Sequence, residues 1–132
     1  MSKGPEVLEV ETQEALDELI KGSGVVVLDV YTGWCGPCSC IEPHFSSMNM
    51  DTEIDALAAT GGGLQFARAC ADNIESLESY RAQACPRFLI FGGVNASKGT
   101  PRADIQAPDT PKITEQVLAA LEETTAILTA PE

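Results

Sequence analysis

The sequence predicts an α/β fold in which helices flank both faces of a central mixed sheet. Two observations predict this fold: strand-like runs alternate with segments of helical spacing early in the chain, and two short strands follow each other closely later. With 132 residues, 44% of them hydrophobic, the chain fits one compact domain. We expect this domain to span residues 1–132, with its core at about 7–124 and a loose tail at 125–132.

The first elements are a short strand, an amphipathic helix and a buried strand. Residues 7–10 alternate in hydropathy as a strand does, and Thr12 is placed to cap the helix that follows. Apolar side chains recur at helical spacing until two glycines stop this helix. Residues 25–30 are apolar on both faces except for Asp29, which predicts a central strand of the sheet.

More helix is expected in the stretch that follows this strand. Pro37 suits the first turn of a helix, where the missing N–H of proline is tolerated, and helical spacing continues through Ile41 and Phe45 to Met48. Apolar residues between positions 54 and 58 indicate a further helix before a triple glycine.

Strands and helices also alternate in the remaining chain. Residues 64–69 alternate as a strand, and Asp72 is placed to cap a helix after it. Residues 88–91 form a short apolar strand that residues 103–106 can pair with as an edge strand, and Pro111 starts a final helix. The apolar positions expected on the two helices are Ile74, Leu77 and Tyr80 in the first, and Ile113, Val117, Leu118 and Leu121 in the second.

The charge of the chain excludes two classes of partner. Lys and Arg number 8 and Asp and Glu number 20, which gives a formal charge of −12 and a pI near 4.3. Nucleic acids and anionic lipids are bound through clustered Lys and Arg, so we expect neither as a partner. The first residues lack the apolar region of a secretory signal, and no apolar stretch is long enough to span a bilayer, so we expect a cytoplasmic location and reduced thiols.

Two of the five cysteines lie three residues apart at the expected start of a helix. Backbone N–H groups and the helix dipole favour a thiolate there, so we expect Cys35 to be a nucleophile. Cys38 lies one turn along the same helix face, where it would attack a mixed disulfide at Cys35 and release a reduced substrate. The pair predicts dithiol–disulfide exchange, for which we expect no cofactor.

A metal site is the alternative interpretation of the same segment. Its ligands would be Cys35, Cys38, Cys40 and His44. A structural zinc site usually draws on two separated ligand pairs, and Pro37 suits a dithiol at a helix start, so we expect no metal. Cys40 should point to a different helix face from Cys38, and Cys70 lies at a strand end, so both are interpreted as packing residues.

Two further residues fit thiol exchange. Asp29 lies in an apolar strand, where burial would raise the pKa of its carboxyl and let it take the proton of Cys38; the alternative is a solvated strand end. Pro86 precedes an apolar strand, where a cis peptide bond would present backbone to an extended substrate; the alternative is an ordinary trans proline in a turn.

In their order and spacing, these residues resemble thioredoxin. The matching positions are Asp29, the run Trp34-Cys35-Gly36-Pro37-Cys38, Pro43, and Pro86 before Phe88-Leu89-Ile90-Phe91. The resemblance implies a thioredoxin-like fold and a reductase, such as thioredoxin reductase, that restores the dithiol. It also implies a substrate or partner groove. The residues of this groove would be Trp34, Gly36, Pro37, Cys85 and Pro86.

Three positions near the expected groove depart from general thioredoxins. Ser39 replaces the usual basic residue after the second cysteine, Cys85 the usual Ile or Val before the proline, and Arg87 the usual Thr after it. In a thioredoxin fold Cys85 would abut the dithiol. A third thiol there would form an alternative disulfide, a sulfenate relay or a metal site between two chains; the alternative is that it merely fills an apolar position. These changes favour a dedicated partner over general disulfide reduction.

Within the superfamily, the chain is most similar to the thioredoxin-like light chains of flagellar outer-arm dynein and to thioredoxin domains fused to nucleoside diphosphate kinase modules. The segments that carry this similarity are Leu28-Asp29-Val30-Tyr31, Ala71-Asp72-Asn73-Ile74, Tyr80-Arg81 and residues 85–91. The mass of 14.0 kDa and the acidity are similar to the smaller type of light chain. The resemblance implies a subunit of the ciliary or flagellar axoneme that binds a dynein heavy chain and other outer-arm subunits and senses redox state. A general cytosolic thioredoxin that reduces protein disulfides is the alternative.

Overall fold

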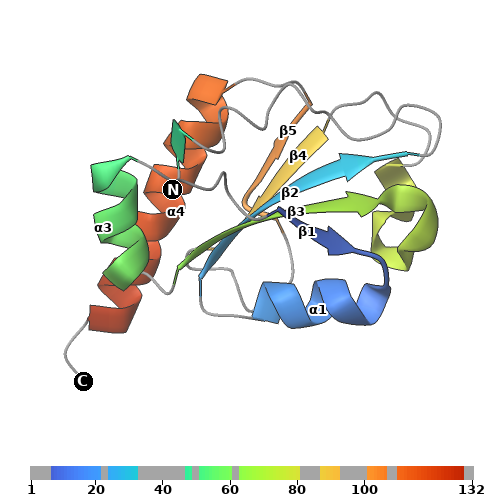
Figure 1. Cartoon of the computed structure of the whole chain (residues 1–132), viewed down its shortest axis with the longest axis horizontal. Coiled ribbons are helices and arrows are strands. Elements are labelled where there is room, and N and C mark those ends of the chain that lie inside the picture. The colour runs from blue at the N-terminus through green and yellow to red at the C-terminus, as the bar shows by residue number, and fades with distance from the viewer. Residues whose placement is uncertain are drawn as a thin grey trace, which may run out of the picture.

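A mixed sheet of order β1-β3-β2-β4-β5 forms the centre of the part of the chain that the computed structural model describes (Figure 1). That part comprises residues 7–21, 24–32, 47–48, 51–60, 63–80, 87–92, 101–106 and 110–129. The strands are β1 (Val7–Val10), β2 (Val25–Tyr31), β3 (Leu64–Cys70), β4 (Arg87–Phe91) and β5 (Ala103–Ile105). β1, β3 and β2 run parallel, whereas β2 pairs antiparallel with β4, and β4 with β5. The predicted α/β fold with a mixed sheet is confirmed.

The helices are α1 (Gln13–Lys21), α3 (Thr52–Thr60), α4 (Thr110–Thr129) and the 3-10 helices η2 (Ala71–Asn73) and η3 (Glu75–Tyr80). The predicted cap of α1 is confirmed, because Thr12 Oγ1 accepts the backbone N–H of Ala15 at 3.1 Å. Asp51 caps α3 in the same manner, accepting two backbone N–H groups of its first turn. Of the helix expected from Pro37 to Met48, only residues 47 and 48 lie within the described chain, and both are helical.

Strand β2 lies at the centre of the sheet, between β3 and β4, as its sequence predicts. Every residue from Val25 to Val30 is buried. A strand with apolar side chains on both faces is stable only where both faces are covered, which explains its position.

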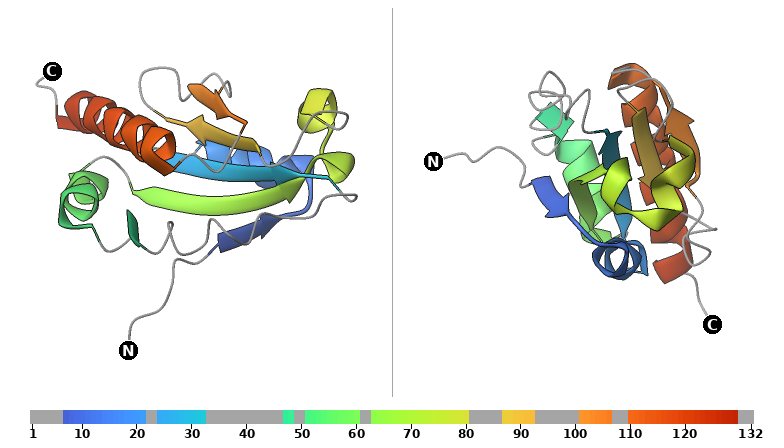
Figure 2. Two further views of the ribbon diagram at one scale, coloured as in Figure 1. Left: turned by 90° about the horizontal axis from the view of Figure 1, so that it is seen from above. Right: turned by 90° about the vertical axis from the view of Figure 1, so that its right-hand side faces the viewer.

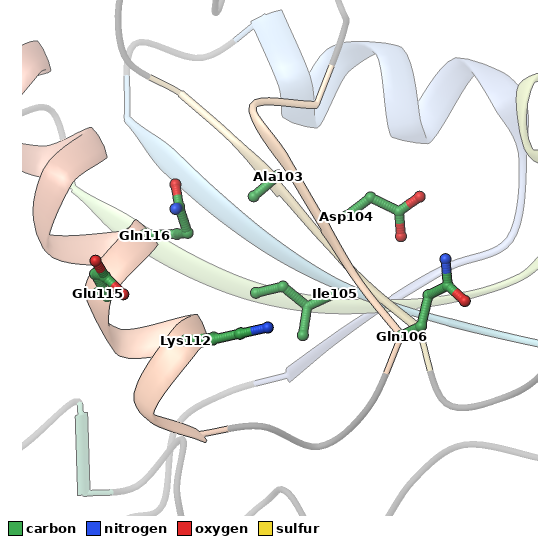
Figure 3. Close-up of a pocket in the computed structure, with 7 residues that line it drawn as sticks. All are labelled: Ala103, Asp104, Ile105, Gln106, Lys112, Glu115 and Gln116. Carbon is green, nitrogen blue, oxygen red and sulfur yellow. The ribbon is translucent and has the colours of Figure 1, made fainter.

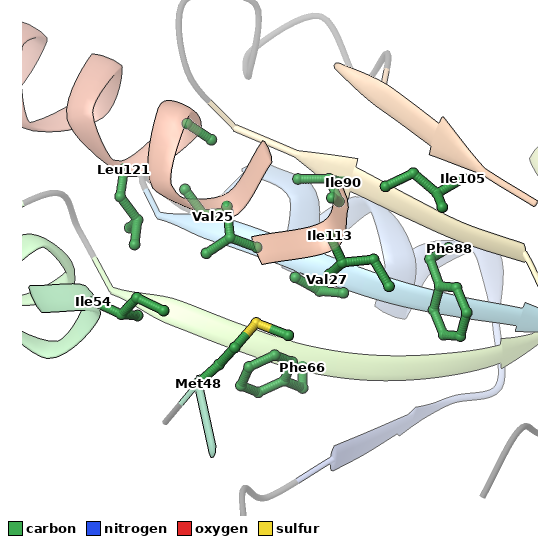
Figure 4. Packing of buried hydrophobic residues seen from close by; sticks show 12 residues of the cluster. Val25, Val27, Met48, Ile54, Phe66, Phe88, Ile90, Ile105, Ile113 and Leu121 are labelled. Atoms are coloured by element: carbon green, nitrogen blue, oxygen red, sulfur yellow. The ribbon is translucent and has the colours of Figure 1, made fainter. Parts of the chain in front are cut away.

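Two apolar cores lie on opposite faces of the sheet. Successive side chains of β2 point to opposite faces, so β2 contributes residues to both cores. Val25 and Val27 pack into the first core with residues of α3 and α4 (Figure 4). Val26 and Leu28 pack into the second core, which α1 and the 3-10 helices cover. Figure 2 shows these helices on either side of the sheet.

The segment after β3 differs from the prediction. Asp72 does not cap an α-helix: it lies inside η2, whose N-cap is Cys70 without a side-chain cap. Ile74 has extended backbone angles (φ −126, ψ 120) and separates η2 from η3. Ile74 and Leu77 are both buried in the second core, so the apolar positions were predicted correctly although the local conformation is 3-10 rather than α-helical.

The final helix is longer than expected, because α4 continues to Thr129 and thereby includes part of the predicted loose tail. Two threonines in this part of α4 form side-chain hydrogen bonds. Thr124 is buried and its Oγ1 donates to the carbonyl of Ala120 at 2.6 Å, whereas Thr125 Oγ1 donates to the carbonyl of Leu57 in α3 at 3.3 Å. The bond of Thr125 ties α4 to α3, whereas that of Thr124 lies within α4.

Candidate functional site

Most of the predicted site residues lie outside the described residues. They are Trp34, Cys35, Gly36, Pro37, Cys38, Cys85 and Pro86. The structure describes Asp29 and the residues that border the two segments, Thr32 before residues 33–46 and Arg87 after residues 81–86.

The borders of these two segments lie at the same end of the sheet. Arg87, at the start of β4, is the direct partner of Val30 near the end of β2, and the two strands are adjacent and antiparallel. Thr32, which follows β2, is buried, with 1% of its surface exposed. The sheet therefore places the point where the dithiol segment begins beside the point where the Cys85-Pro86 segment ends, although the two are far apart in the sequence.

Asp29 is buried, with 3% of its surface exposed, so the expectation of burial is confirmed and the solvated alternative is wrong. Its partners in the sheet are Arg68 on β3 and Phe88 on β4. Side chains two residues apart on a strand share a face, so Asp29 lies on the face of Val27 and Tyr31, at the edge of the first core. The carboxyl of Asp29 is therefore buried two residues before the end of β2.

Polar side chains surround the end of β2 on the side of β3. Arg68 forms an ion pair with Glu9 of β1, with 3.4 Å between Nε and Oε1. Burial, and next the negative charge of Glu9, raise the pKa of Tyr31 above its ordinary value. Tyr31 is paired in the sheet with Cys70, whose thiol donates weakly to Asp72 Oδ2 at 3.7 Å. Cys70 lies at the strand end, as predicted, and is half-buried there rather than fully buried in the core.

Arg87 is buried, although the sequence placed it near the expected groove. Its side chain is 5% exposed and pairs with Asp104 of β5, with 2.5 Å between Nη1 and Oδ2. The guanidinium also lies over the ring of Tyr80, 4.8 Å from the ring centre. Burial, and next the charge of Asp104, raise the pKa of Tyr80. This cluster anchors the first residue after Pro86 to the edge strand and to η3.

Asp104, the ion-pair partner of Arg87, was not predicted from the sequence. Two features of the sequence could have indicated this pair. Arg87 is a cation at the start of an otherwise apolar strand, and Asp104 is an acid in the strand expected to pair with it. Within the described ranges, no group of three His, Cys, Asp or Glu side chains could hold a metal ion; Cys35, Cys38, Cys40 and His44 lie outside them. Among the described helices, none has the length and hydropathy needed to cross a membrane.

Comparison with known proteins agrees with the geometry. The family model described as Thioredoxin matches residues 6–110. Human thioredoxin domain-containing protein 6 is 34% identical over 86% of this chain, and human thioredoxin domain-containing protein 3 is 32% identical over the same share. The Dynein 16 kDa light chain, flagellar outer arm, of Chlamydomonas reinhardtii is 26% identical over 83% of this chain and 65% of its own length. This chain spans 31% of the first human relative and 18% of the second.

Solved structures show the same fold. Thioredoxin from Malassezia sympodialis superposes with a TM-score of 0.64 at 20% identity, covering 92% of this chain and 95% of its own. A thioredoxin mutant from Halobacterium salinarum gives a TM-score of 0.61 at 22% identity, covering 92% and 96%.

Proposed function

The chain belongs to the thioredoxin family, and we propose that it is a redox-competent light chain of an outer dynein arm in a cilium or flagellum. The observation that carries this proposal is the similarity to the flagellar outer-arm light chain of Chlamydomonas reinhardtii across 83% of this chain. Its partners are then a dynein heavy chain and other subunits of the arm, and its location is the axoneme. Residues 1–132 act as a single thioredoxin-like domain in this complex.

The proposed chemistry is dithiol–disulfide exchange. The thiolate of Cys35 attacks one sulfur of a partner disulfide; that S–S bond breaks, a mixed disulfide forms, and the released partner thiolate takes a proton from solvent. Cys38 gives its proton to Asp29 and attacks the sulfur of Cys35. The second partner sulfur leaves as a thiolate and is protonated, and Cys35 and Cys38 are left as a disulfide. A thioredoxin reductase then supplies the two electrons that restore the dithiol.

Two described features support this mechanism. Asp29 is 3% exposed and lies near the end of β2, three residues before the last described residue that precedes the dithiol segment. Val30 and Arg87 are direct partners in the sheet, so the chain enters the dithiol segment beside the place where it leaves Cys85 and Pro86. In the proposed site the groove for the partner is formed by five residues: Trp34, Gly36, Pro37, Cys85 and Pro86.

A trapping experiment tests the proposed partner. The Cys38→Ser variant, expressed in ciliated cells, cannot resolve mixed disulfides at Cys35, so its partners remain bound on non-reducing gels. The matched control is the double variant Cys35→Ser with Cys38→Ser, which keeps the surface but lacks the nucleophile. A very large partner, captured near one to one and absent from the control, supports the light-chain proposal. Many small partners would contradict it.

General disulfide reduction is the second candidate function, because the family model covers residues 6–110, and the sequence holds the whole Cys-Gly-Pro-Cys motif. Insulin reduction with thioredoxin reductase and NADPH measures it directly. Turnover comparable to that of an ordinary thioredoxin, together with many trapped partners, would favour a general reductase. Slow turnover with one large trapped partner would favour the dedicated subunit.

A further inference from the structure

A hollow of about 580 Å³ lies beside the edge strand β5 and the first turns of α4 (Figure 3). Residues 103–106 line it from consecutive positions, and Lys112, Glu115 and Gln116 line it from the helix. Successive side chains of a strand point to opposite faces, and Figure 3 shows Ile105 directed toward α4 and Asp104 directed away from it. The hollow therefore follows the outer edge of β5 rather than one face of the sheet.

The outer edge of β5 offers backbone groups to a further strand. Among the described strands, β5 pairs with β4 alone and ends the sheet. An edge strand presents a row of N–H and C=O groups that an extended chain can pair with, and this is how several peptide-binding domains hold their ligands.

Both walls of the hollow are held in place by the fold. Arg102, directly before β5, donates from Nε to Gln116 Oε1 at 3.3 Å and pairs through Nη1 with Glu123 Oε2 at 2.7 Å, which ties the strand to α4. Asp104 is held from the other face by Arg87. The hollow is thus formed before any ligand arrives, which lowers the entropy cost of binding.

The residues that line the hollow and the net charge of the chain indicate which kind of ligand the hollow binds. Five of the seven lining residues are polar or charged, whereas sites for small molecules are mostly apolar and enclosed. A second copy of the chain is disfavoured, because each copy carries a formal charge of −12 and the two would repel each other. The same charge attracts a basic segment, and the lining of the hollow has two carboxylates, those of Asp104 and Glu115, against one cation, Lys112.

We propose that this hollow docks an extended, basic segment of a partner protein as an additional strand beside β5. The backbone of the segment pairs with the outer edge of β5, and its basic side chains face Glu115. This docking does not use the dithiol, so it goes beyond the proposed exchange chemistry and holds whether or not that chemistry occurs.

The test uses synthetic peptides as probes, with binding followed by NMR of the backbone amides of the full chain. The first probe alternates lysine and valine; the second has the same sequence with every backbone nitrogen methylated, so that it cannot donate hydrogen bonds; the third alternates glutamate and valine. We expect the first probe to shift the amides of residues 103–106. The methylated probe should bind about tenfold more weakly, which corresponds to the loss of one or two hydrogen bonds, and the acidic probe should not bind.

A matched pair of variants tests the place of binding. Glu115 and Glu122 are both exposed on α4, and only Glu115 lines the hollow. Glu115→Lys should weaken binding of the lysine probe about fivefold, whereas Glu122→Lys, with the same change in charge, should weaken it less than about twofold.

Three results would overturn the proposal. Equal losses in the two variants would mean that the probe is attracted only by the net charge. Equal binding of the methylated and unmethylated probes would exclude strand pairing. A dimer of the probe-free chain in sedimentation, with the amides of residues 103–106 at its interface, would assign the edge to a second copy. Since the probes contain neither thiols nor disulfides, the outcome is independent of exchange at Cys35.

Discussion

The ion pair between Arg87 and Asp104 should contribute more to stability than an ordinary surface pair. Its cationic end is 5% exposed and its carboxylate end 36% exposed, so removal of the carboxylate leaves a buried guanidinium that water reaches poorly. Breaking a fully buried pair costs about 3–5 kcal/mol, whereas an exposed pair contributes about 0.2–1 kcal/mol. Asp104 is partly solvated, and Tyr80 remains in contact with the cation, so we expect Asp104→Ala to cost about 2 kcal/mol.

The assay is urea unfolding followed by circular dichroism, with a second ion pair of the sheet as the control. Glu9 pairs with Arg68 at 3.4 Å and its side chain is 55% exposed, so Glu9→Ala should cost less than about 1 kcal/mol. A double-mutant cycle with Arg87→Met measures the coupling, and we expect about 1–2 kcal/mol between Arg87 and Asp104. If Asp104→Ala cost no more than Glu9→Ala, burial of Arg87 would not make this ion pair more important than an exposed one.

Three other predictions follow from single positions. Gly92 has φ of 140° and an added Cβ would lie 2.9 Å from Val25 Cγ2, so Gly92→Ala should lower the free energy of unfolding by about 2–3 kcal/mol. Gly63 has φ of 100° but nothing within 4 Å of an added Cβ, so Gly63→Ala should lower it by only about 1 kcal/mol. Thermal or urea unfolding measures both. The pKa of both Tyr31 and Tyr80 is raised from 10.0, so the stability they contribute is fully present below pH 10.0 and is lost as the pH rises through the folded pKa. Tyrosinate absorbance should show both rings titrating at higher pH in the folded than in the urea-unfolded chain. Coincident titration curves would contradict the burial of these rings. Asp29→Asn should slow insulin reduction at neutral pH about 10–100-fold if the carboxyl takes the proton of Cys38, and an unchanged rate would remove it from the mechanism.

The local sequence pattern predicts most elements of the sheet and its flanking helices, because each has a distinct period. The run from Val25 to Val30 is apolar on both faces, which only a central strand satisfies, and it is buried at the centre of the sheet. Thr12 caps α1 because its hydroxyl reaches a backbone N–H of the first turn, a contact that depends on adjacent residues alone. The candidate site residues can also be predicted from the sequence, since the dithiol motif is recognised from residue types at fixed spacing.

Contacts between residues far apart in the sequence decided the features that no hydropathy pattern predicts. Ile74 has extended backbone angles and separates two 3-10 helices after β3, although helical spacing predicted one α-helix there, and both Ile74 and Leu77 are buried in the second core. Thr125 ties α4 to α3 through a bond to Leu57, a residue 68 positions away. Arg87 pairs with Asp104 only because antiparallel pairing brings β4 and β5 together. The sequence by itself determined where most of the strands and helices form and which residues are the candidates for thiol chemistry, since both depend on neighbours along the chain. The tertiary structure alone decided where helices end and which charges are buried, because those outcomes depend on neighbours in space.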